Sequence, residues 1–112
     1  MDTHLAIHEI RNQMQGLSLE TGLRFNKDSF GIYISTSFYE PGLGMLEAHK
    51  DGHGDAPILH YMMPLTFEGQ DYTGGGLHVR GWDGEIADID SLVNAGDLIF
   101  FDGRCEHWVK KI

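Results

Sequence analysis

The stretch "EAHKDGHGD" contains two histidines and three carboxylates, and the pattern His-x-Asp occurs in it twice. The first copy is His49 with Asp51, and the second is His53 with Asp55. Residues i and i+2 of an extended chain project to the same side, so either copy can present one nitrogen and one oxygen to a single metal ion. A third ligand must come from elsewhere, and the candidate is His107 in "CEHWV".

Two histidines and one carboxylate on one side of an ion leave its other side open. This donor set suits Fe(II) that activates oxygen, because the open positions can take a co-substrate and then O2. A loop rich in His, Asp and Gly is also typical of a solvated turn, so His-x-Asp alone is a weak motif. The prediction of a metal site therefore depends mainly on the segments that surround this motif.

The elements that must position these residues follow from hydrophobic periodicity. Residues 2–20 have apolar side chains at roughly helical spacing, which predicts one amphipathic helix, with Asp2 or Thr3 as its cap and Gly22 near its end. After Gly22 the pattern becomes that of strands. Strands or extended segments are expected over residues 30–39, 45–51, 58–67, 77–81, 97–101 and 107–112, with a hairpin at 82–86 and a weakened second half of 58–67 at Pro64. The prediction is a mainly β antiparallel barrel or jelly roll with one N-terminal helix, built as a single domain over residues 1–112.

Composition excludes several kinds of partner. The chain has 17 acidic and 8 basic residues and a formal net charge of -9, and no Lys/Arg stripe, so nucleic acid is not an expected partner. The single cysteine, Cys105, cannot form an internal disulfide, which favours a cytoplasmic location. No apolar run approaches the ~20 residues that span a bilayer, and the N-terminus lacks a signal-peptide core, so no membrane partner is expected.

Four segments in order resemble the 2-oxoglutarate- and Fe(II)-dependent dioxygenases, and within them the prolyl-hydroxylase-like branch, from about residue 35 to residue 112. They are "FYEPGLGMLEAHKDG", "ILHYMMPL", "TGGGLHV" and "AGDLIFFDGRCEHWV". The resemblance implies a double-stranded β-helix, a jelly roll with Fe(II) held by His49, Asp51 and His107. It also implies 2-oxoglutarate as co-substrate and O2. Tyr61 would hydrogen-bond the far carboxylate of 2-oxoglutarate, and Tyr39 would lie near its metal-bound end. An ordinary buried tyrosine is the alternative for both.

The resemblance also favours one of the two His-x-Asp copies. In the family several residues separate the aspartate from the next buried strand. Asp51 is followed by "GHGDAP" before Ile58, whereas Asp55 is followed only by "AP". We therefore expect His49 and Asp51 to be the ligands, and His53 and Asp55 to be solvated residues of a rim loop.

Other polar residues near these motifs have simpler interpretations. His60 and His78 are expected to be structural residues on strand faces. Glu106 precedes the distal histidine and could orient it, although a surface carboxylate is the better expectation.

The sequence departs from the family after the distal histidine. The family holds 2-oxoglutarate with an arginine on the following strand, whereas this sequence ends five residues after His107. Lys110 and Lys111 come too early, and Arg80 or Arg104 are the other candidates for this anchor. The expectation is that the usual final strand is missing. It would then be supplied by a longer chain, by a strand-donating partner or a homodimer at the C-terminal edge, or not at all.

The predicted function is hydroxylation of a C–H bond with decarboxylation of 2-oxoglutarate to succinate, on a small-molecule or peptidyl substrate that the sequence does not define. The alternative is a non-enzymatic metal-binding β-barrel, a sensor or interaction module that has lost 2-oxoglutarate binding. A cupin with another metal ranks lower, because the chain lacks the His-x-His and Glu pattern. Succinate formation separates the first two hypotheses.

Overall fold

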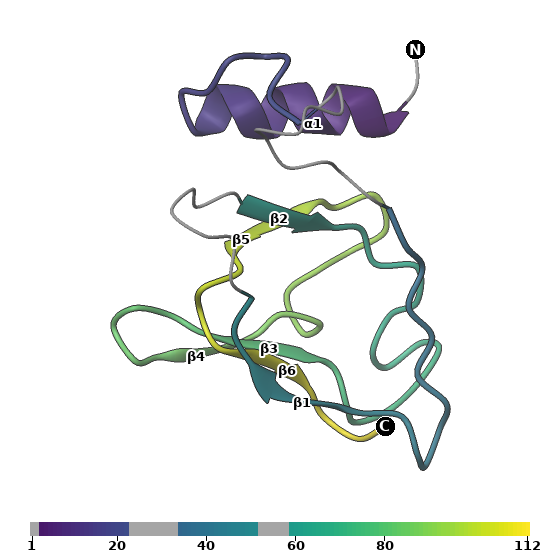
Figure 1. The fold of residues 1–112 in the computed structure, drawn as a ribbon. Helices are drawn as coiled ribbons and strands as arrows, with labels where there is room; N and C mark the ends of the chain where they lie inside the picture. Colours follow the sequence, from purple (N-terminus) through teal and green to yellow (C-terminus); the bar gives the residue numbers. More distant parts are fainter. Residues whose placement is uncertain (1–2, 23–33, 52–58) are drawn as a thin grey trace. The chain divides into compact units, whose positions relative to one another are not determined.

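A computed structural model describes residues 3–22, 34–51 and 59–112. The chain divides into two compact units, Met1–Ser37 and Phe38–Ile112. The described parts contain one helix in the first unit and six strands in the second (Figure 1).

Helix α1 spans Thr3–Met14 and ends earlier than its apolar periodicity predicts. Gly16 has a φ of 66°, the left-handed conformation that glycine adopts without strain. The N–H of Gly16 donates to the carbonyl of Gln13, and the N–H of Leu17 donates to that of Asn12. These two bonds form a Schellman motif, which satisfies the last carbonyls of the helix. The predicted end near Gly22 is therefore wrong. Helix α1 is also neither long nor apolar enough to cross a membrane.

The second unit contains two antiparallel sheets. The strands are β1 (Leu46–His49), β2 (Leu59–Met62), β3 (Leu77–Arg80), β4 (Ile86–Asp88), β5 (Ile99–Asp102) and β6 (His107–Val109). One sheet has the order β1-β6-β3-β4, and the other pairs β2 with β5. Figure 1 draws them as two layers. The expectation of a mainly β fold with antiparallel strands is confirmed, but the described residues form two sheets and no closed barrel.

The strand pairs are nested along the chain. β3 pairs with β4, β2 pairs with β5, and β1 pairs with β6, all antiparallel. The segment from β1 to β6 is therefore a two-stranded ribbon whose tip is the β3–β4 turn. The ribbon folds over so that β3 also pairs with β6. Strand β3 lies next to the tip of the ribbon and β6 lies at its open end, so this pairing brings residues from the two ends of the ribbon together.

Several predicted strands are shorter in the structure, and one is absent over the part of it that the structure describes. Residues 34–39 form no strand, and residues 30–33 lie outside the described ranges. The half-buried strand β2 stops at Met62, as the proline at position 64 predicts. The predicted hairpin forms, with Gly84 at a φ of 84°.

The last strand covers only His107–Val109, and it lies in the middle of its sheet between β1 and β3. Both sides of these three residues are already paired. A partner strand therefore has no free edge along residues 107–109, and the predicted partner at the C-terminal edge stays a prediction. The free strand sides among the described residues belong to β1, β4, β2 and β5.

The core of the second unit consists of Leu77, Val79, Cys105 and Val109, with Tyr39, Ile89 and Phe101 packed against it. Alternate residues of a strand share a face, so Val109 and His107 of β6 point to the same side. The buried His107 is therefore placed beside the apolar core.

Candidate metal centre

His49 and His107 are brought together by the pairing of β1 with β6. They are direct cross-strand partners, and their ring centroids are 4.3 Å apart. Leu46 pairs with Val109 in the same ladder, so three steps along β1 match two steps along β6. The extra residue is a β-bulge, which lets Leu46 and His49 share the face of Val109 and His107.

Asp51 follows β1 and completes the group. Its backbone N–H donates to the carbonyl of Gly103 at 2.8 Å, which ties the segment after β1 to the turn before β6. Its Oδ2 lies 3.2 Å from Nε2 of His107, and its Oδ1 lies 3.6 Å from Nε2 of His49. One ligand atom from each of the three residues lies within 4.8 Å of the others. We refer to these three residues as the His-Asp-His group.

Backbone carbonyls set the orientation of both imidazoles. Nδ1 of His49 lies 2.8 Å from the carbonyl of Glu47, and Nδ1 of His107 lies 2.8 Å from that of Cys105. A carbonyl oxygen can only accept, so Nδ1 carries the proton in each ring. With this bond in place, a neutral imidazole directs the lone pair of Nε2 toward Asp51, and this is the form of histidine that binds a metal.

His78 provides an internal comparison. Its Nδ1 makes the same kind of bond to the carbonyl of Gly76, at 3.0 Å, and its Nε2 lies 3.8 Å from Asp88. The bond to the carbonyl of residue i−2 is therefore not special to metal ligands. What distinguishes His49 and His107 is that both Nε2 atoms converge on one carboxylate.

The spacing of the donor atoms fits a first-row metal ion. Ligand atoms that share one ion at about 2.1 Å are about 3.0 Å apart at right angles and about 3.4 Å apart at the tetrahedral angle. The distance from Nε2 of His107 to Oδ2 of Asp51, 3.2 Å, and that from Nε2 of His49 to Oδ1, 3.6 Å, lie close to this range. His107 is 5% exposed, whereas the side chains of His49 and Asp51 are each 35% exposed. The group is thus buried on the β6 side and open to solvent on the other.

A third histidine, His60, for which a structural role is expected from the sequence, also lies close to Asp51. Nδ1 of His60 lies 3.5 Å from Oδ2 of Asp51. His60 pairs with Phe101 across β2 and β5, and their ring centroids are 5.5 Å apart. The Phe101 ring in turn lies edge-on to His107 at 5.1 Å. Strand alternation allows only one of His60 and its neighbour in β2 to face this side, but it does not tell which of the two.

Tyr61 is that neighbour. It pairs with Phe100, and their ring centroids are 6.2 Å apart. Since His60 and Phe101 face the His-Asp-His group, Tyr61 and Phe100 project from the opposite face of the β2–β5 sheet. This position does not favour the predicted contact between Tyr61 and 2-oxoglutarate.

Tyr39 is half-buried and packs against the core cluster of the second unit. Burial raises the pKa of its phenol. Packing against the core is a sufficient reason for a tyrosine at this position. The predicted role of Tyr39 at the metal-bound end of 2-oxoglutarate stays a prediction.

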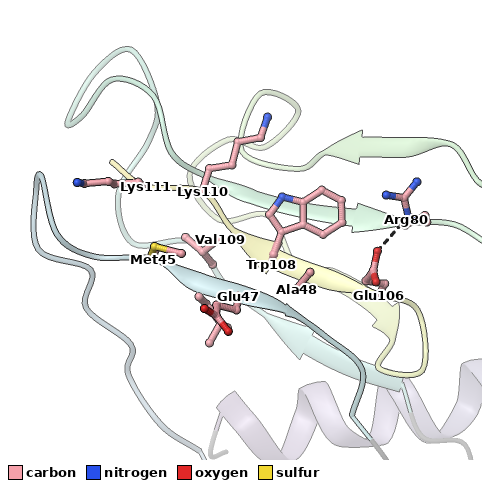
Figure 2. Close-up of a pocket in the computed structure, with 10 residues that line it drawn as sticks. Met45, Glu47, Ala48, Arg80, Glu106, Trp108, Val109, Lys110 and Lys111 are labelled. Atoms are coloured by element: carbon pink, nitrogen blue, oxygen red, sulfur yellow. Dashed lines mark hydrogen bonds and ion pairs between the residues drawn. The ribbon is translucent and has the colours of Figure 1, made fainter.

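Glu106 turns away from the His-Asp-His group. Its carboxylate accepts from Nε of Arg80 at 3.1 Å on the outer face of the four-stranded sheet (Figure 2). The two side chains line a hollow of about 470 Å³ beside β1 and β6. Lys110 and Lys111 line this same hollow, which includes none of the three group residues. The expectation of a surface carboxylate fits this position, because the Nδ1 partner of His107 is the Cys105 carbonyl.

The second candidate anchor, Arg104, is also paired. Its guanidinium donates to both carboxylate oxygens of Asp102, at 2.6 Å for the shortest contact, and this hydrogen bonding lowers the pKa of Asp102. The guanidinium also lies 5.6 Å from the ring centroid of the exposed Trp82. Arg80 and Arg104 are thus both held by carboxylates.

His53 and Asp55 lie outside the described residues, so the choice of the first His-x-Asp copy over the second stays a prediction. No protein-family model, curated protein or solved structure gave a significant match to the chain.

Proposed function

We propose that the chain is an Fe(II)- and 2-oxoglutarate-dependent dioxygenase that hydroxylates a C–H bond. The observation that carries this proposal is the convergence of two histidine Nε2 atoms and one carboxylate on a face that remains open to solvent. Three protein ligands on one side leave room on the other for a co-substrate and O2, which is the donor set of non-haem Fe(II) oxygenases.

The strand pairing supports the corresponding fold. A double-stranded β-helix is a long two-stranded ribbon wound so that its successive strand pairs lie in two facing sheets. The nested pairs β1–β6, β2–β5 and β3–β4 have this pattern, and β2 and β5 occupy a different sheet from the other two pairs. The ends of β1 and β6 nearest the ribbon's β2–β5 section carry the His-Asp-His group.

In this proposal Nε2 of His49, Nε2 of His107 and the carboxylate of Asp51 hold the iron. Bound Fe(II), with 2-oxoglutarate and O2, supplies the oxidising power for C–H hydroxylation while 2-oxoglutarate is converted to succinate and CO2. The chain contributes orientation and shielding. The carbonyls of Glu47 and Cys105 hold the two rings, and the Phe101 ring covers one side of His107.

The pairing of Arg80 with Glu106 and of Arg104 with Asp102 favours a second candidate function. An arginine already held by a carboxylate is a poor anchor for the far carboxylate of 2-oxoglutarate. The alternative is a metal-binding module without turnover, a sensor or an interaction domain.

Succinate formation tests the proposal. Purified protein is mixed with Fe(II), ascorbate, 2-oxoglutarate and O2, and succinate is quantified with and without candidate small-molecule and peptide substrates. The proposal predicts succinate from the wild type and none above background from Asp51→Ala. Stoichiometric metal binding with no succinate would favour the non-enzymatic module.

A further inference from the structure

His60 lies close to the carboxylate of Asp51 and belongs to a different sheet from His49 and His107. Its Nδ1 lies 3.5 Å from Oδ2 of Asp51, and it belongs to β2, whereas His49 and His107 belong to the β1–β6 pair. Asp51 is therefore approached by three imidazoles from two sheets. An ionised carboxylate only accepts hydrogen bonds, so a hydrogen bond across this 3.5 Å approach requires His60 to donate through Nδ1–H.

His60 lies outside the set of atoms that could share one ion. Among the described residues, the set within mutual reach of 4.8 Å consists of the His-Asp-His group and does not include His60. Its ring therefore touches a ligand without joining the ligand set. Carboxylates that bind metals are commonly held by such outer hydrogen bonds, and loss of the outer partner typically weakens metal binding about 10- to 100-fold.

The surroundings of His60 leave room for the ring in this position. A Cβ atom added at Gly103 would lie 2.7 Å from Nε2 and 2.9 Å from Cε1 of His60, closer than real contacts allow. The absence of a side chain at Gly103 thus lets the imidazole lie against the backbone of the turn. The same glycine accepts the hydrogen bond from the N–H of Asp51. Gly103 therefore contacts both His60 and Asp51.

We propose that His60 is a positioning residue of the metal site, whose Nδ1–H faces Oδ2 of Asp51 and orients this carboxylate toward the ion. This inference rests on the proposed metal site. It adds a specific role for β2 and for Gly103, because both are needed to bring the donor to the carboxylate.

Co(II) titration of the metal-free protein tests this inference without any turnover. Co(II) is bound by the same ligand types as Fe(II), and its visible absorption reports the ligand set. His60→Phe keeps a ring but removes the donor, and His60→Asn keeps an N–H near the position of Nδ1. We expect Co(II) affinity to fall about 10- to 100-fold in His60→Phe with an unchanged band shape, and to recover in His60→Asn.

Three results would overturn the inference, and they differ in whether they also contradict the ligand set or the metal site. Wild-type affinity in His60→Phe would remove the role of His60 alone. A Co(II) spectrum altered as in His107→Ala would make His60 a ligand instead of a positioning residue. Failure of the wild type to bind Co(II) would remove the metal site, and with it the proposed function.

Gly103→Ala provides an independent test if His60→Phe does not fold. Its Cβ must displace the imidazole of His60, so Co(II) affinity should fall in the wild-type background. The shorter side chain of His60→Asn does not reach Gly103, so adding Gly103→Ala to that variant should change little. Equal weakening in both backgrounds would show that Gly103 acts independently of His60 and would contradict the inference. Circular dichroism of each variant verifies folding.

Discussion

His49 and His107 are direct cross-strand partners on the antiparallel strands β1 and β6, with ring centroids 4.3 Å apart. The bulge between Leu46 and His49 places both rings on one face of the sheet. A slip of one residue in such a ladder moves a side chain to the other face. The convergence of these two imidazoles on Asp51 therefore depends on the register of β1 against β6.

Substitution of the group residues should abolish metal binding, whereas substitution of His78 should not. His49→Ala, Asp51→Ala and His107→Ala each remove one of three ligands, and we expect Co(II) affinity to fall by more than about 100-fold, beyond the effect of an outer partner. His78→Gln is the matched control, because His78 makes the same Nδ1–carbonyl bond but lies outside the group. Isothermal titration measures the affinities.

The same titrations decide between the two His-x-Asp copies. His53→Ala and Asp55→Ala should bind Co(II) like the wild type. Binding that survives Asp51→Ala and is lost in Asp55→Ala would reverse the assignment of the ligands.

Tyr61→Phe should leave Co(II) affinity and 2-oxoglutarate affinity unchanged. The reason is strand alternation, which directs Tyr61 away from the face that carries His60. Anaerobic titration of 2-oxoglutarate into the Fe(II) protein, followed by the absorption of the chelate, measures the second affinity. A large loss of 2-oxoglutarate affinity in Tyr61→Phe would restore the role that the family resemblance implies.

Tyr72 should make the stability of the fold sensitive to alkaline pH. Burial, and then its hydrogen bond to Asp90, raise the pKa of the Tyr72 phenol above its ordinary value of 10.0. The folded state therefore keeps this proton more tightly than the unfolded state. The stabilisation is fully present below pH 10 and is lost as the pH rises from 10 through the folded-state pKa.

Tyr72→Phe tests this assignment. It removes the hydrogen bond to the Asp90 carboxylate, so the free energy of unfolding near pH 7 should fall by about 1–3 kcal/mol. Its stability should then decline less steeply than that of the wild type above pH 10. Urea unfolding below and above pH 10 measures both, and equal slopes in the two proteins would contradict the assignment.

Cys105 should react slowly with thiol reagents in the native protein. It is 8% exposed within the core cluster, and burial raises the pKa of its thiol from 9.0. Both effects lower the amount of accessible thiolate at neutral pH. Ellman's reagent should label the urea-unfolded protein much faster than the native one. Equal rates would show that the core around Cys105 opens readily.

The sequence predicted the three residues of the group because His-x-Asp on an extended chain and a distal histidine have recognisable types and spacing. It did not predict the position of His60, because that depends on which face of β2 turns toward β1 and β6. Two adjacent polar residues, His60 and Tyr61, compete for that face, and strand pairing with β5 decides between them. Residue types alone give no information about such pairing.

The helix shows a similar limit. Apolar periodicity continues to Leu17, which suggested a helix to residue 20, but Gly16 in the left-handed conformation ends α1 at Met14. Backbone conformation at one glycine outweighs the periodic pattern there. Likewise the β-branched and aromatic run over residues 34–39 forms no strand, because strand propensity depends on a partner that pairs with it.

The most direct test of the metal site is a crystal structure of the protein with Mn(II), with anomalous differences measured to locate the ion. Mn(II) binds to the same types of ligand as Fe(II) and is not oxidised by O2 during crystallisation. We predict one anomalous peak per chain, bonded to Nε2 of His49, Nε2 of His107 and one carboxylate oxygen of Asp51. A peak bonded to His53 and Asp55, or no peak at the His-Asp-His group at saturating Mn(II), would contradict the account.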